Sequence, residues 1–188
     1  IRGEIHGFLL NHQRVVKSID ISTHTVPGVP NIVTCNDKGA SSVTLWSTEN
    51  GRAERLVGSH DTIPASTTCF SYCGKQLFIG YRSGEIKKFS TKTAIFMTSF
   101  DVNRILTTSH GDNPSVTRLQ NKRRKKKSLG IVESKTSAGG ATPHPDGVLA
   151  IYCALGNEFI VSVGPDGVVH TWDFQHNAKI ATFSLDQT

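Results

Sequence analysis

The densest group of charged side chains lies in the stretch NKRRKKKS, residues 121–128. Cations at this density can pair with the phosphates of a nucleic acid, with an affinity that falls steeply as salt is added. No aromatic, Asn or Gln side chain is interleaved among the cations to read bases, so little sequence preference is expected. The six consecutive cations are Lys122, Arg123, Arg124, Lys125, Lys126 and Lys127.

Three interpretations of this basic run stay open. As a nuclear or nucleolar address it needs only exposure, and Lys/Arg clusters of this length suit that use. As an RNA contact it would neutralise several phosphates, and this role is compatible with the first. The third interpretation is a solvated insertion with no partner.

The charge of the rest of the chain narrows the choice of partners. Lys and Arg number 21 against 15 Asp and Glu, which gives a net charge of +6, and removing the six cations of the run leaves zero. Electrostatic attraction to an acidic polymer is therefore concentrated in one segment. A folded body that binds nucleic acid over its whole surface is not favoured.

Side chains that could catalyse a reaction or hold a metal are scattered. A catalytic role for Asp166 would need a second acid or a His held near its carboxylate, and the sequence offers no evidence of such a partner. Cys69 and Cys73 could begin a zinc site, but no second pair follows them. We therefore expect no metal and no cofactor, and four reduced, buried thiols. The eight histidines lack metal-ligand spacing: His6, His12, His24, His60, His110, His144, His170 and His176.

Signatures of enzymes and of membrane segments are missing from these 188 residues. There is no Gly-x-Ser-x-Gly elbow, no P-loop and no His-Glu-x-x-His motif, so an enzyme with a small-molecule substrate is not expected. The loose glycine pattern at 80–85 lies in a hairpin, where no helix follows to hold a phosphate. No apolar run is as long as a transmembrane helix, and no membrane association is expected.

Three internal repeats provide the scaffold for these residues. Each has a short apolar strand, a Gly-containing turn, an alternating strand that ends in an aromatic residue, a polar break and another apolar strand. Gly39, Gly84 and Gly167 stand where hairpin turns need a residue that tolerates positive φ. The repeats read NIVTCNDKGASSVTLWSTENGRAERLVG, QLFIGYRSGEIKKFSTKTAIFMTSF and EFIVSVGPDGVVHTWDFQHNAKIATFSL.

The spacing of the terminal aromatics predicts a β-propeller. Trp46 and Phe89 are 43 residues apart, within the ~40–45 of one four-stranded WD-type blade. Phe89 and Trp172 are 83 residues apart, which allows either a further blade or an insertion. We favour the insertion, because residues 101–151 contain no Phe, Tyr or Trp. The three aromatics are interpreted as blade packing rather than ligand platforms.

The predicted fold is therefore all-β, a propeller fragment of about three four-stranded blades. We expect two degenerate repeats in residues 1–101, a basic, disordered insertion in 102–145 and the third blade in 146–188. A propeller needs about four to eight blades to close. These residues are thus expected to be part of a larger ring, or to owe their packing to a partner.

The third repeat resembles the WD-repeat signature in the stretch PDGVVHTWD at 165–173. The resemblance implies that Asp166, six residues before Trp172, hydrogen-bonds within its blade. The other repeats have Ala40 and Ser83 at that position. Trp46, Gly84, Phe89, Asp166, Gly167 and Trp172 are accordingly expected to be structural blade positions.

Taken together, the repeats resemble in order and spacing the tandem-propeller WD-repeat proteins of the UtpB complex. The most specific part runs from Cys73-Gly74 through Ile79-Gly80 and Ser83-Gly84 into the strand that ends at Phe89. The resemblance implies a non-catalytic scaffold of the small-subunit processome in the nucleolus, which supports pre-18S rRNA processing. Its implied partners are other propeller subunits, the guide small nucleolar ribonucleoprotein and pre-rRNA.

Two other classes of protein remain open. A generic WD-repeat adaptor would bind protein partners outside ribosome assembly and carry the basic run as a plain loop. A stand-alone RNA-binding domain would fold independently and show a steep salt dependence. The neutral blades weigh against this second class.

Overall fold

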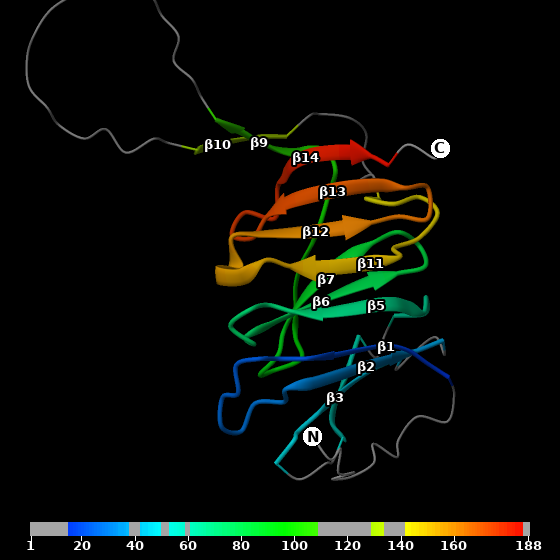
Figure 1. Cartoon of the computed structure of the whole chain (residues 1–188), viewed down its shortest axis with the longest axis vertical. Coiled ribbons are helices and arrows are strands. Elements are labelled where there is room, and N and C mark those ends of the chain that lie inside the picture. The colour runs from blue at the N-terminus through cyan, green and yellow to red at the C-terminus, as the bar shows by residue number, and fades with distance from the viewer. Residues whose placement is uncertain are drawn as a thin grey trace, which may run out of the picture.

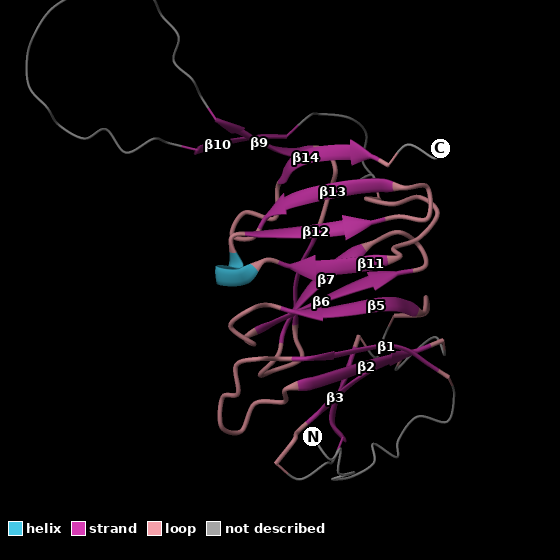
Figure 2. Cartoon of the chain, in the orientation of Figure 1, coloured by secondary structure: helices cyan, strands magenta, loops and turns pink. Residues whose placement is uncertain are grey.

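The computed structural model describes residues 15–37, 42–49, 53–58, 61–108, 129–133 and 142–185. These ranges contain fourteen strands, grouped in three sheets that stack one beside the next (Figure 1). Their one helical element is a short 3₁₀ turn, Leu155–Asn157 (Figure 2). Within the described ranges no helix is long and apolar enough to cross a membrane.

Each blade is a four-stranded antiparallel meander in which consecutive strands pair. Blade 1 consists of β1 (Val16–Ile21), β2 (Ile32–Asn36), β3 (Val43–Trp46) and β4 (Ala53–Val57). Blade 2 consists of β5 (Ala65–Phe70), β6 (Gln76–Tyr81), β7 (Ile86–Ser90) and β8 (Phe96–Ser99). Blade 3 consists of β11 (Ala150–Cys153), β12 (Phe159–Val163), β13 (Val168–Asp173) and β14 (Lys179–Ser184).

Tight turns join the second and third strands of blades 2 and 3. Gly84 has a φ of +85° and Gly167 a φ of +75°, values that a side chain with a Cβ adopts only under strain. The expected turn residue of blade 1, Gly39, lies outside the described residues. The two described turns therefore use glycine for its backbone freedom.

A hairpin lies on the outer edge of blade 3, beside β14 (Figure 1). It consists of β9 (Arg104–Thr108) and β10 (Leu129–Glu133), and β9 pairs in parallel with β14 through Ile105 and Lys179. Both strands fall inside the range 102–145 that the sequence predicts to be a disordered insertion. Ordered segments thus extend into that range, while residues 109–128 and 134–141 lie outside the described residues.

Two apolar clusters hold the blades together. The first joins blades 1 and 2 and includes Leu45, Ile79 and Tyr81. The second joins blades 2 and 3 around Phe78 and Trp172. Each buried large side chain contributes about 1.5–3 kcal/mol relative to an exposed position. Stability therefore comes from packing of sheet on sheet.

The prediction of an all-β fold with about three four-stranded blades and a long insertion is confirmed. Between Phe89 and Trp172 the described residues hold no additional four-stranded sheet. The extra spacing instead contains the β9–β10 hairpin and the residues around it.

Candidate functional site

The terminal aromatic residues predicted from the repeats are buried at the ends of the third strands or next to them. Trp46 and Trp172 are almost fully enclosed, and Phe89 is also buried. Trp172 Nε1 donates a hydrogen bond to Ser162 Oγ at 2.9 Å, and Trp46 Nε1 donates one to Thr34 Oγ1 at 2.8 Å. Because a buried indole N–H needs an acceptor, these hydroxyls fix the rings in the blades.

The strand register explains why blade 2 has Phe instead of Trp. Leu77 lies opposite Phe89, and two residues further along β6 is Ile79. In blade 1, Ile32 lies opposite Trp46, and Thr34 is two residues further along the strand. In blade 3, Ile160 lies opposite Trp172, and Ser162 is two residues further along. Phe89 has no N–H to satisfy, so a buried Ile at this position leaves no donor unpaired.

His144 is a structural residue that the sequence patterns missed. It has no exposed surface, and its Nε2 lies 2.8 Å from Ser162 Oγ, the oxygen that also accepts from Trp172. Its ring centroid is 4.9 Å from that of His170. Burial, and secondarily the nearby His170, lower the pKa of His144 to about 4. The imidazole is therefore neutral at physiological pH.

Asp166 sits beside this network, in the turn before β13. Its Oδ1 accepts a hydrogen bond from the backbone N of Val168 at 3.0 Å. A Cβ placed on Gly164 would lie 2.5 Å from Asp166 Oδ1 and 2.7 Å from His144 Nδ1. Gly164 thus leaves the space in which the carboxylate and the imidazole come close together. The geometry gives Asp166 a role in shaping the turn of blade 3.

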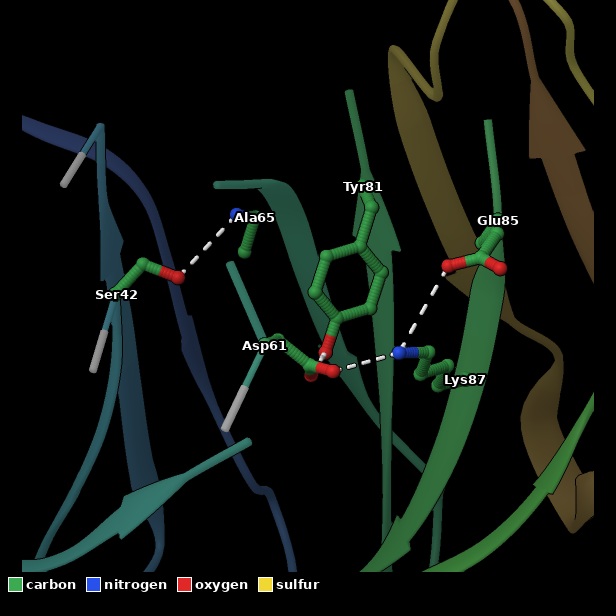
Figure 3. Close-up of polar contacts among 6 residues, drawn as sticks. All are labelled: Ser42, Asp61, Ala65, Tyr81, Glu85 and Lys87. Carbon is green, nitrogen blue, oxygen red and sulfur yellow. Dashed lines mark hydrogen bonds and ion pairs between the residues drawn. The ribbon is translucent and has the colours of Figure 1, made fainter. Parts of the chain in front are cut away.

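A second polar cluster lies between blades 1 and 2 (Figure 3). Asp61, in the connection from β4 to β5, accepts hydrogen bonds from Tyr81 Oη at 2.5 Å and from Lys87 Nζ at 2.7 Å. Lys87 Nζ also lies 3.7 Å from Glu85 Oε2 and 4.8 Å from the centroid of the Tyr81 ring. Burial and the bond to Asp61 raise the pKa of the Tyr81 phenol, so it stays protonated as a donor.

This cluster borders a hollow that we name the blade 1–2 groove. Its larger part has a volume of about 450 Å³ and its smaller part about 230 Å³. Asp61 and Lys87 line both parts. Beside it, the backbone N of Ala65 donates to Ser42 Oγ at 3.2 Å, which ties the two blades together. The larger part is otherwise lined by Leu56, Gly58, Phe89, Ala94, Ile95 and Phe96.

The cysteines do not form a metal centre in the described part of the chain. No group of three or more His, Cys, Asp or Glu side chains there could hold a metal ion. All four thiols are free, and Cys35, Cys69 and Cys153 are buried, whereas Cys73 is partly exposed. Cys69 lies in β5, and Cys73 lies in the turn between β5 and β6.

The basic run, residues 122–127, lies outside the described residues. The strands on either side of it are described, and Thr108 and Leu129 are partners in the β9–β10 ladder. The chain therefore leaves and re-enters the fold at the outer edge of blade 3 (Figure 1).

The fold and the buried blade residues define a fragment of a WD-repeat β-propeller. Solved structures similar to it are the WD40 repeats of RRP9 and the structure of U3-55K, each with a TM-score of 0.62 and 16% sequence identity. The similarity covers 95% of this chain and 41% and 42% of those chains, so the chain spans about two fifths of their length. No protein-family model and no curated protein matches the sequence.

Proposed function

We propose that this chain is part of a non-catalytic propeller scaffold in small-subunit ribosome biogenesis. In this role it supports pre-18S rRNA processing within the small-subunit processome of the nucleolus. The proposal rests on where the segments that resemble UtpB propeller proteins lie in the fold. They coincide with β2 and β3, with β6 to β8 and with β12 to β14, which are successive strands of three consecutive blades.

A propeller suits scaffolding because its meander core is rigid while its loops and outer edges face partners. Here two apolar clusters join three consecutive blades. The proposed partners are other propeller subunits of the processome, the guide small nucleolar ribonucleoprotein and pre-rRNA. Binding to the RNA is either direct or through these proteins.

The basic run has a defined point of attachment for such a role. The β9–β10 hairpin pairs with the outer edge of blade 3, and Thr108 and Leu129 face each other at the ends of the intervening segment. The segment between them thus begins and ends at the outer edge of blade 3. In this proposal, Lys122 to Lys127 serve as a nucleolar address or as a phosphate contact.

The test is a pull-down of tagged full-length protein from nuclear extract at moderate and at high salt, with sequencing of the RNA and identification of the proteins. A parallel variant replaces residues 122–127 by Ser. We expect pre-rRNA and processome propeller proteins at both salt concentrations. Loss of RNA alone in the Ser variant would assign a phosphate contact to the run, because counterion release dominates such binding.

A generic WD-repeat adaptor is the second candidate function. It is favoured by the neutral charge of the chain outside the basic run and by the apolar lining of the blade 1–2 groove. The same pull-down separates the two candidates. Unrelated protein partners without ribosomal precursors would support the adaptor and refute the role in ribosome biogenesis.

A further inference from the structure

The blade 1–2 groove has an apolar end that is open to solvent. Leu56 comes from β4 of blade 1, whereas Ile95 and Phe96 come from the last turn and strand of blade 2. Ile95 is 64% exposed and Phe96 is 51% exposed. Large apolar side chains gathered around a hollow, rather than scattered singly, mark an interaction site. Phe96 packs edge to face on the buried Phe89, with centroids 5.8 Å apart, so the wall of the hollow is fixed.

The other end of the groove is polar and carries an excess of negative charge. The carboxylates of Asp61 and Glu85 share the ammonium of Lys87. Asp61 is satisfied by Lys87 and Tyr81, while the Glu85 side chain is 45% exposed and lies 3.7 Å from Lys87. Among the charged side chains of the described residues that line the groove, two carboxylates thus face one ammonium. A cation that approaches Glu85 would balance the charge.

The two ends lie along β7 (Ile86–Ser90) and Glu85, the residue directly before it. Glu85, Lys87 and Phe89 are spaced by two residues, so their side chains share the face of the sheet that looks toward blade 1. At about 3.3 Å per residue, Glu85 and Phe89 are separated by roughly 13 Å. An extended peptide has the same rise per residue. Because a Lys or Arg side chain spans several ångströms itself, a matching peptide needs two to four residues between its apolar anchor and its cation.

We propose that the blade 1–2 groove binds an extended peptide segment of a partner protein, with a large apolar side chain in the hollow and a Lys or Arg beside Glu85. The hollow of about 450 Å³ is of the size that holds ligand groups in proteins. The partner is a protein because the excess negative charge repels nucleic acid phosphates. This site is independent of the proposed role in ribosome biogenesis.

The first experiment selects phage-displayed random twelve-residue peptides on the full chain. We expect enrichment of sequences with Phe, Leu or Met and a Lys or Arg that is separated from it by two to four residues. The best peptide is then labelled with fluorescein and titrated with the protein. Absence of enrichment, or a consensus with acidic residues in place of the cation, would overturn the proposal.

Variants locate the binding. Ile95→Asp should weaken the labelled peptide at least tenfold, because it places a charge in the apolar hollow. Leu149→Asp is the matched control, since Leu149 is 63% exposed on the segment before blade 3, and should bind as the wild type does. Circular dichroism checks that both variants are folded. Equal affinity of the Ile95→Asp variant and the wild type would refute the site.

A charge reversal tests the polar end. The Glu85→Lys variant should prefer a peptide in which the cation is replaced by Glu, whereas the wild type should prefer the original peptide. A structural role of Glu85 alone would lower both affinities without changing their order. An unchanged order of preference in the variant would therefore contradict the proposed contact.

Discussion

Gly84 and His144 are in contact through their backbones. The backbone N of His144 donates to the carbonyl oxygen of Gly84 at 3.3 Å, and a Cβ on Gly84 would collide with the carbonyl of His144. The turn of blade 2 is thereby joined to the loop that supplies the buried imidazole of blade 3. A glycine that the sequence marks as a turn former also makes a contact between blades.

This contact predicts a large effect of Gly84→Ala. The new Cβ would meet backbone, which cannot move aside as a flexible side chain can, and φ is +85°. We expect a loss of more than about 3 kcal/mol in the free energy of unfolding, measured by urea denaturation. Gly28→Ala is the control, because Gly28 has a φ of +70° with no atom within 4 Å of a Cβ. It should cost only about 1–2 kcal/mol of backbone strain, and equal losses would contradict the contact.

Stability should fall as the pH is lowered from about 6.5 to about 4. Burial lowers the pKa of His144 from 6.5 to about 4, so in this range the unfolded chain binds the proton and the native chain does not. The contribution of neutral His144 to the free energy of unfolding is complete above pH 6.5. It is lost as the pH falls toward 4, and the loss is up to about 3 kcal/mol. Burial also lowers the pKa of His170, which acts in the same direction.

Urea denaturation at several pH values checks this dependence. A His144→Gln variant is expected to be less stable at pH 7 but to have a flatter profile between pH 6.5 and 4, since one titrating group is gone. Identical slopes for the variant and the wild type would show that His144 does not titrate in this way.

Ser162 should contribute more to the stability of the fold than its small side chain suggests. Its Oγ accepts from Trp172 Nε1 and contacts His144 Nε2, and all three groups are buried. Ser162→Ala would leave two buried polar groups without this partner, at about 1–3 kcal/mol each. Ser162→Thr keeps the hydroxyl, as Thr34 does in blade 1, and should retain most of the stability. Thermal unfolding measures the stability lost in each variant. A similar loss in Ser162→Ala and Ser162→Thr would show that the shape of the side chain, and not its hydroxyl, is responsible.

Cys73 should be the first thiol to react with iodoacetamide. Burial raises the pKa of the Cys73 thiol, but hydrogen bonds from Ser71, the Lys75 backbone and Asn157 outweigh it and the pKa is lowered. Burial raises the pKa of Cys35 to about 11 and that of Cys69 to about 12. Because the thiolate is the nucleophile, mass spectrometry at pH 8 should find the label on Cys73 first.

The Cys73→Ser variant provides the control for this labelling. It should lose the fast phase of modification, while the slow phase from the buried thiols remains. Rapid labelling of Cys35 or Cys69 in the folded protein would contradict the burial on which the prediction depends.

Local signals in the sequence determined the strands and the turns. Alternating apolar residues, the glycines at 84 and 167 and the aromatic residues at regular spacing are properties of single segments, so the fold class follows from them. The buried positions of Trp46 and Trp172 follow in the same way, because each ends an alternating strand. The sequence by itself therefore determined the blade type.

Tertiary structure alone decided which residues meet between segments. His144 lies in the range 102–145, outside the repeat motifs, and its role comes from contacts with Gly84 and Ser162 on two different blades. The parallel pairing of β9 with β14 likewise joins strands that are distant in the chain and share no sequence pattern. The groove at Asp61 and Lys87 exists because two sheets pack side by side. A linear pattern records the period of one strand, whereas these contacts depend on how separate strands are placed in space.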